Sequence, residues 1–100
     1  MDNIFFECRS LKALNISNLK TQNLSNMEYM FYDCKLLKSL DLSSFNTLNV
    51  HFMDDMFNDC NSLLSLDLSN FNTQNIISMS HILYNCSSLI KKNHIYKIYD

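Results

Sequence analysis

The amino-acid sequence predicts an α/β repeat solenoid of about 3.5 open-ended coils, each with one short parallel strand and one short helix. Two observations lead to this prediction. The stretch from Cys34 to Val50 returns as the stretch from Cys60 to Ile76 with 11 of its 17 positions unchanged. The same period of 26 residues separates all four cysteines, Cys8, Cys34, Cys60 and Cys86. A strict period over a whole chain indicates stacked structural units.

Each unit begins with a predicted strand, at residues 11–16, 37–42 and 63–68, where the pattern is L-x-x-L-x-(L/I). Leu40 and Leu42 alternate with Asp41, which places the two leucines on one face of a strand and Asp41 on the other. Turn-forming residues follow. Because the chain has no Gly and no Pro, we expect Asn, Asp and Ser to make the turns.

A short amphipathic helix is predicted next. Val50, Met53, Met56 and Phe57 stand at i, i+3, i+6 and i+7, which is one face of a helix, and residues 24–31 and 76–83 repeat this spacing. Asn49 or Thr47 is placed to cap its start. Three residues mark the place where the helix turns back, a position that favours left-handed backbone: Asp33, Asp59 and Asn85.

Stacking of the units is expected because one strand and one short helix cannot bury their own apolar faces. The units fall at residues 8–33, 34–59 and 60–85, within a repeat domain of residues 1–90. Neighbouring strands would pair about 4.8 Å apart over a core of Leu, Met and Phe. Residues 1–5 align with residues 27–31, so the chain starts within a unit. We expect a fragment of a longer array or an internal Met taken as the start.

The period lies within the range of roughly 20–29 residues that is typical of leucine-rich repeats. The stretch "SLDLSNFNTQNI", followed by M-x-x-(M/I)-(F/L)-x-x-C-x-x-L, resembles the BspA-type leucine-rich repeats, also called DUF285 surface-protein repeats. The resemblance covers residues 1 to about 90. It implies a leucine-rich-repeat fold and a cell-surface or host-interaction protein such as an adhesin.

Composition excludes several classes of protein. With 47% apolar and 18% charged residues the chain is too apolar to be disordered. Its net charge of −2 offers no basic patch to nucleic acid. No apolar run approaches the roughly 20 residues that span a bilayer. The first ten residues lack the basic start and apolar core of a signal peptide, so localisation is unknown from the residues, and the resemblance suggests the cell surface.

We expect no enzymatic activity and no cofactor or metal site. Nucleophilic catalysis needs a Cys or Ser, a His and a carboxylate brought together. His51, His81 and His94 do not share the register of the cysteines and are expected at the surface. A chain without Gly also has no Gly-rich loop to hold phosphate.

Two columns of residues are expected to be structural. Cys8, Cys34, Cys60 and Cys86 would form a ladder of buried free thiols, although stacked neighbours also lie within the Cα separation of a disulfide. Metal binding is disfavoured because the chain has no C-x-x-C pair. Asn23, Asn49 and Asn75 would form a ladder whose amides satisfy backbone groups between coils, with ligand contacts as the alternative.

The predicted partner-binding residues lie on the outward face of the strands: Lys12, Lys38, Asp41, Leu64 and Asp67. Asp41 and Asp67 would stand one strand apart, and such close like charges need solvent or a bridging cation such as calcium. We predict a non-enzymatic scaffold that binds an unidentified protein or glycan. The alternative is a purely structural spacer within a longer array.

The two ends of the chain differ from the repeats. Residues 91–100 carry net charge +2 and break the pattern, so we expect either a C-terminal edge strand, blunted by its lysines, or a tail. At the other end, Phe5, Leu11 and Leu14 would be uncovered. An exposed apolar end favours end-to-end self-association.

Overall fold

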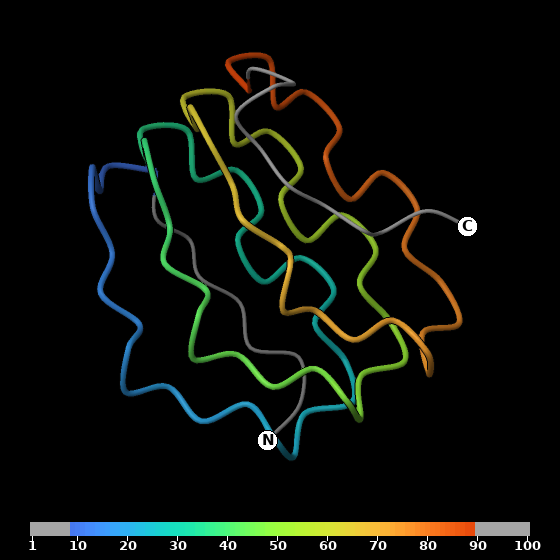
Figure 1. The fold of residues 1–100 in the computed structure, drawn as a ribbon. Coiled ribbons are helices and arrows are strands. Elements are labelled where there is room, and N and C mark those ends of the chain that lie inside the picture. Colours follow the sequence, from blue (N-terminus) through green and yellow to red (C-terminus); the bar gives the residue numbers. More distant parts are fainter. Residues whose placement is uncertain (1–8, 90–100) are drawn as a thin grey trace.

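The computed structural model describes residues 9–89, in which the 26-residue units lie side by side. Figure 1 shows the chain returning once per unit, so that equivalent segments become neighbours. Residues 9–89 contain no helix and no strand longer than a single bridge residue. Parallel bridges join Asn26 to Phe52 and Phe52 to Ser78. Neighbouring units therefore run in the same direction.

The predicted α/β solenoid of strands and helices is wrong. The helices expected at residues 24–31, 50–57 and 76–83 are absent, and runs of turns stand at residues 28–33, 54–59 and 80–85. Left-handed backbone interrupts these segments, with φ of 62° at Tyr29, 57° at Asp55 and 57° at His81. An α-helix needs right-handed backbone at every residue. The apolar spacing that indicated a helix therefore belongs to a series of turns with one buried side.

The N–H groups of these turns bond to the following unit. In one unit, Met53 donates to the carbonyl oxygen of Ser78 (2.9 Å), Asp55 to that of Ser80 (3.0 Å), Phe57 to that of Ile82 (3.1 Å) and Asp59 to that of Tyr84 (2.9 Å). The unit before it repeats the pattern from Met27, Tyr29, Phe31 and Asp33 to Phe52, Asp54, Met56 and Asn58. The residues in between close turns within their own unit. Hydrogen bonds thus link the units without a regular helix or strand.

A second left-handed position ends each series of turns. Here φ is 65° at Asp33, 68° at Asp59 and 60° at Asn85. Asp and Asn adopt this conformation more readily than other residues with a Cβ atom, because their short polar side chains bond locally. The predicted left-handed backbone at these three residues is confirmed.

The L-x-x-L-x-L segments supply the core without forming strands. Leu37, Leu40 and Leu42 are buried, while Asp41 between them is exposed. The predicted alternation of buried and exposed side chains is therefore confirmed. A backbone hydrogen bond from Leu64 N–H to the Lys38 carbonyl oxygen (3.1 Å) joins two of these segments.

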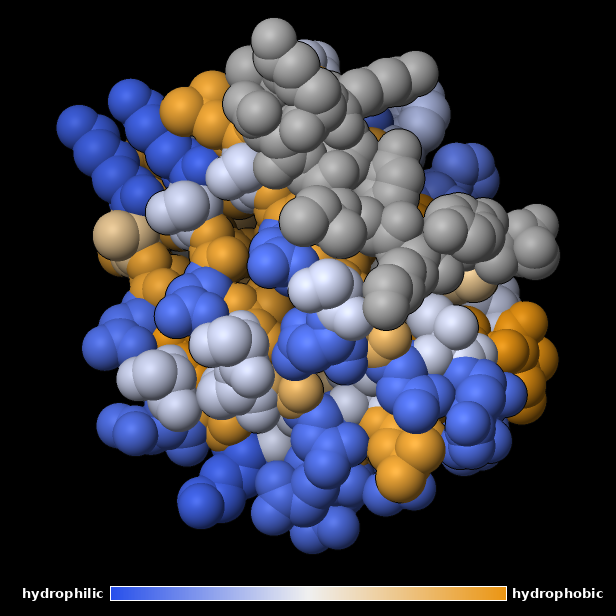
Figure 2. Space-filling view, viewed as in Figure 1, coloured by the Kyte–Doolittle hydropathy of each residue, from blue (hydrophilic) through white to orange (hydrophobic). Residues whose placement is uncertain are grey.

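Phenylalanine side chains stack through the core at the unit period. The rings of Phe31 and Phe57 are 5.6 Å apart and nearly parallel, at 6°, and those of Phe45 and Phe71 are 6.3 Å apart at 4°. Burying one such side chain contributes about 1.5–3 kcal/mol. Figure 2 shows hydrophilic residues over most of the visible surface, with smaller apolar patches between them. The continuous apolar interior is therefore the main stabilising element.

Four sequence predictions lie outside the described residues. These are the positions of Phe5, Cys8 and His94 and the edge strand or tail of residues 91–100. At the first described unit, Leu11 is 47% exposed, and Leu14 packs partly against the core.

Candidate functional site

The structure places all five predicted partner-binding residues at the surface. We call them the candidate face: Lys12, Lys38, Asp41, Leu64 and Asp67. Lys12, Lys38 and Leu64 occupy one register position in three successive units, and Asp41 and Asp67 occupy another in two. Leu64 is 51% exposed although it is apolar. The face therefore combines charged groups with one accessible apolar side chain.

The two aspartates of the candidate face each hold a turn. Asp41 Oδ1 accepts a hydrogen bond from Ser43 N–H (3.0 Å), and Asp67 Oδ1 accepts one from Ser69 N–H (2.9 Å). At the same position in the first unit, Asn15 Oδ1 accepts from Ser17 N–H (3.0 Å). Since an amide performs the same task as a carboxylate, the turn does not need the negative charge.

Both carboxylates remain ionised at neutral pH. Hydrogen bonds from the Ser43 side chain, and then from its backbone, lower the pKa of Asp41. Ser69 lowers the pKa of Asp67 in the same way. The candidate face thus carries two negative charges in adjacent units, available to groups outside the chain.

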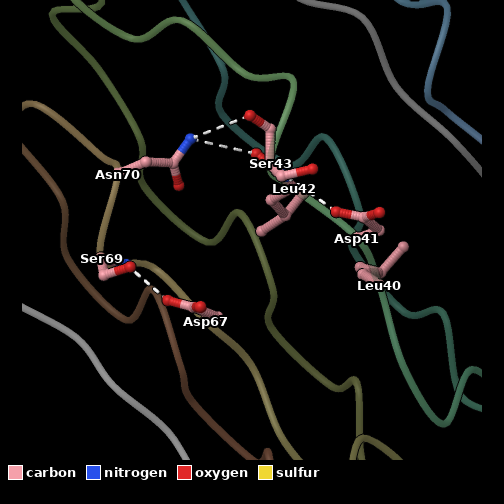
Figure 3. Close-up of a pocket in the computed structure, with 7 residues that line it drawn as sticks. All are labelled: Leu40, Asp41, Leu42, Ser43, Asp67, Ser69 and Asn70. Atoms are coloured by element: carbon pink, nitrogen blue, oxygen red, sulfur yellow. Dashed lines mark hydrogen bonds between the residues drawn. The ribbon is translucent and has the colours of Figure 1, made fainter.

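An open hollow of about 160 Å³ lies beside these turns (Figure 3). Its lining residues are Leu40, Asp41, Leu42, Ser43, Asp67, Ser69 and Asn70. Asn70 Nδ2 donates to the carbonyl oxygens of Leu42 (3.3 Å) and Phe45 (3.2 Å), which joins the two rims across the unit boundary. Ligand pockets for small molecules measure roughly 300–1,000 Å³. The hollow is smaller and has room for a single side chain.

The structure brings together only part of the candidate face. Asp41 and Asp67 both line the hollow, whereas Lys12, Lys38 and Leu64 lie outside its lining. Sequence reasoning had not identified Asn70, which occupies the position of Ser44 and Asn18 in the other units. Its change from Ser to Asn was the available signal.

The asparagine ladder links successive units. Asn49 Nδ2 donates to the Gln22 carbonyl oxygen (2.8 Å), and Asn75 Nδ2 donates to that of Leu48 (2.7 Å). Asn23 belongs to the same column and is exposed. These amides make the contacts between units that the ladder prediction requires.

Threonines form a further ladder that sequence reasoning missed. Thr21 and Thr47 are each 1% exposed. The Thr21 hydroxyl donates to the Asn46 carbonyl oxygen (3.1 Å) and accepts from Asn46 N–H (2.8 Å). The signal in the sequence was the recurrence of Thr21, Thr47 and Thr73 at 26 residues.

The cysteine column divides into two kinds of residue. Cys60 and Cys86 are free and buried, and their thiols donate to the carbonyl oxygens of Phe31 (3.0 Å) and Phe57 (3.1 Å). Burial raises the pKa of Cys60 to about 12 and that of Cys86 to about 11. Such thiols are poor nucleophiles. Cys34 differs from the expected free thiol, because it is disulfide-bonded.

Two histidines can be located. His81 is exposed, with its ring 5.4 Å from that of Tyr84, and His51 is half-buried beside Phe52. Residues 9–89 contain no group of three or more His, Cys, Asp or Glu side chains that could hold a metal ion. In the same residues, no helix has the length and apolarity to cross a membrane.

The turns at residues 28–33 and 54–59 gather acidic and aromatic side chains. The Tyr29 and Tyr32 rings meet edge to face at 5.6 Å. The charge of Asp55 is the main cause that raises the pKa of Tyr29. The sequence did not predict the pairing of Tyr29 with Asp55. The equivalent positions of the three units hold three different residue types, Tyr29, Asp55 and His81.

Comparisons with known proteins add one result. Neither the curated proteins nor the solved structures gave a match. A family model described as "Mycoplasma protein of unknown function, DUF285" matches residues 1–99, a span that includes all the units described above. The chain therefore belongs to the DUF285 family.

Proposed function

We propose that the chain is a non-enzymatic protein-binding scaffold in which the candidate face holds the partner. One observation carries this proposal: the turn hydrogen bonds are the same in each unit, whereas the exposed residues above them change. Asn15 accepts this bond without the negative charge that Asp41 and Asp67 carry. At another register position, two units have a lysine, Lys12 and Lys38, and the third has Leu64. A constant framework with variable exposed residues suits partner recognition by a repeat protein.

The chemistry of the face suits a protein partner with basic side chains. Asp41 and Asp67 line the hollow and remain charged. A Lys or Arg side chain fits a hollow of about 160 Å³ between two carboxylates. Leu64, at 51% exposure, offers apolar contact beside it. Interfaces commonly combine such an apolar contact with a polar rim.

A role at the cell surface is part of this proposal. It rests on the resemblance of the repeat motif to BspA-type surface proteins, to which the membership of the DUF285 family adds support. In this proposal the chain belongs to an adhesion protein and contacts proteins of another cell.

The alternative function is a structural spacer. The threonine and asparagine ladders favour it, since the polar groups of both form hydrogen bonds between one unit and the next. A spacer would need no conserved chemistry on the candidate face, so the two functions differ in their response to surface substitutions.

Adhesion of beads coated with the purified chain to cultured epithelial cells tests the proposal. The test variant carries Lys38→Ser, Asp41→Asn, Leu64→Ser and Asp67→Asn. The Asp→Asn changes keep the turns, as Asn15 shows. A matched control carries Lys20→Ser, Leu48→Ser and Gln74→Ser, which alter exposed residues in other columns.

We expect the test variant to lose most of the adhesion and the control to retain it, with unchanged melting temperatures for both. Treating the cells with protease should also abolish adhesion. Equal adhesion by the test variant and the unaltered chain would contradict the proposal. Absence of adhesion by every form would favour the spacer.

A further inference from the structure

The last described unit ends in a row of backbone N–H groups that have no hydrogen-bond partner among residues 9–89. The N–H groups of Met79, His81, Leu83 and Asn85 make no hydrogen bond within residues 9–89. In the two preceding units, every equivalent N–H donates to the next unit, over distances of 2.8–3.1 Å. We call these four groups the donor edge. Unpaired groups along an edge are a template for pairing with another chain.

Apolar side chains beside the donor edge are incompletely covered. Val50, Met53, Met56 and Phe57 are 0% exposed, but their equivalents in the last unit are only partly buried: Ile76, Met79, Ile82 and Leu83. Residues 68–89 also contain no Asp, Glu, Lys or Arg. Proteins commonly protect open edges with charged side chains, and residues 68–89 supply none.

The donor edge has a direction. The carbonyl groups of Ser78, Ser80, Ile82 and Tyr84 already accept hydrogen bonds from the preceding unit. At the alternate residues, the four N–H groups are therefore left for the next unit. Beside them, the Ile77 carbonyl group occupies the position at which Ser25 and His51 accept from the next unit, over 2.8 Å from His51 N–H and 2.7 Å from Ile77 N–H. The four N–H groups themselves cannot pair with an identical row, because that row supplies no acceptors. A partner must present a row of carbonyl groups.

We propose that the donor edge docks a second copy of this chain, head to tail. The second copy meets it with the carbonyl side of a unit. The contact would continue the interfaces between units within one chain, which already repeat the same donors and acceptors twice. The carbonyl side of a unit of this sequence therefore fits the donor edge. Such a heterologous contact does not by itself close into a ring, so we expect association to extend beyond a dimer. This proposal is independent of the candidate face.

Hydrogen–deuterium exchange and light scattering, both over a range of concentrations, test the docking. At low concentration, Met79, His81, Leu83 and Asn85 should exchange fast, whereas Met53, Asp55, Phe57 and Asp59 stay protected. At high concentration the four edge amides should become protected. Meanwhile, the average mass should rise past double the 11.8 kDa of one chain.

A pair of threonine variants provides the matched control. Thr47 holds the next unit through its hydroxyl, while Thr73 occupies the same position at the donor edge and its hydroxyl has no partner in residues 9–89. Thr73→Val should leave the melting temperature at low concentration unchanged and weaken association about 10-fold. Thr47→Val should lower the melting temperature and leave the association of the folded chain intact.

Three results would overturn the docking. The first is a mass that stays at that of one chain at every concentration. The second is protection of the four edge amides at every concentration, which would mean that the edge is covered within one chain. The third is a mass that stops at a dimer, since a head-to-tail dimer would still have one open donor edge.

Discussion

The Thr47 hydroxyl forms two hydrogen bonds with the backbone of Asn72. The hydroxyl donates to the Asn72 carbonyl oxygen (3.1 Å) and accepts from Asn72 N–H (2.7 Å), across an interval of 25 residues. Thr21 does the same for Asn46. One side-chain atom thus satisfies both polar groups of a residue in the next unit. These contacts fix how far each unit is displaced from its neighbour.

Thr47→Val should therefore lower the free energy of unfolding by about 1–2 kcal/mol, because it removes two part-buried hydrogen bonds to the backbone of Asn72. Urea denaturation measures the change. Thr47→Ser keeps the hydroxyl and should cost less than half as much. If the Ser and Val variants were equally destabilised, the hydroxyl contacts would not be the cause.

Asp41→Asn with Asp67→Asn should leave the melting temperature at pH 7 nearly unchanged, because Asn15 makes the same turn without charge. Asp41→Ala with Asp67→Ala should lower it, since Ala cannot accept from Ser43 or Ser69. Thermal unfolding by circular dichroism compares the two pairs. A loss as large for Asn as for Ala would show that the turns depend on the charge.

The pKa values of Asp41 and Asp67 give a pH dependence with a definite sign. Both are lowered below the ordinary value of 3.8. The turns therefore contribute stability above that pH, and the contribution is lost as the pH falls through the lowered values. The Asp41→Asn, Asp67→Asn variant should lose less stability between pH 5 and pH 2 than the unaltered chain. Parallel pH profiles would refute this dependence.

The buried thiols should make the fold sensitive to alkaline pH. The pKa values of Cys60 and Cys86 rise from an ordinary 9.0 to about 12 and about 11. Their contribution is complete below pH 9, where unfolded thiols are neutral, and declines as the pH rises toward the folded values. At pH 10 the loss is about 1 kcal/mol for each thiol.

Denaturant midpoints at pH 8 and pH 10 measure this loss. The control variant carries Cys60→Ala and Cys86→Ala, and it should show a smaller difference between the two pH values, whatever its absolute stability. An equally steep loss in the variant would assign the alkaline sensitivity to other groups.

Asp55→Val should lower the free energy of unfolding by about 1–2 kcal/mol, because a β-branched residue is strained at a φ of 57°. Asp55→Asn should be nearly neutral, since Asn tolerates this backbone. Ser44→Val changes an exposed residue whose φ is not positive and controls for the new side chain. Urea denaturation measures the free energy of unfolding of the three variants. An unchanged value for Asp55→Val would contradict left-handed backbone at this residue.

The sequence predicted which side chains are buried better than it predicted the backbone. Leu37, Leu40 and Leu42 face the core as the alternation indicated. Asp33, Asp59 and Asn85 are left-handed because residue types that favour this backbone stand there. Both features follow from local chemistry that each unit repeats.

The helix prediction failed because apolar spacing alone does not specify hydrogen bonding. Val50, Met53, Met56 and Phe57 are all buried, as a helix would also have them. The structure differs from a helix at Tyr29, Asp55 and His81, which have left-handed backbone. These three residues are of different types, so the sequence does not indicate this backbone. Partners 25 residues away replace the local bonds, and a local pattern cannot reveal them.

The candidate site was predictable to a similar degree. The exposed positions of Lys38, Asp41, Leu64 and Asp67 follow from the repeat register. The hollow and the bridging role of Asn70 depend on two units meeting in space. The free thiol expected at Cys34 was wrong, and the disulfide found there is the alternative that the spacing allowed.

Scalar coupling across hydrogen bonds, measured by NMR on the isotope-labelled chain, shows whether hydrogen bonds from one unit to the next hold the units together in place of helices. We expect the amide nitrogen of Asp55 to couple to the carbonyl carbon of Ser80, whose oxygen lies 3.0 Å away. Coupling of Asp55 to the carbonyl carbon of His51, its partner in an α-helix, would contradict the account.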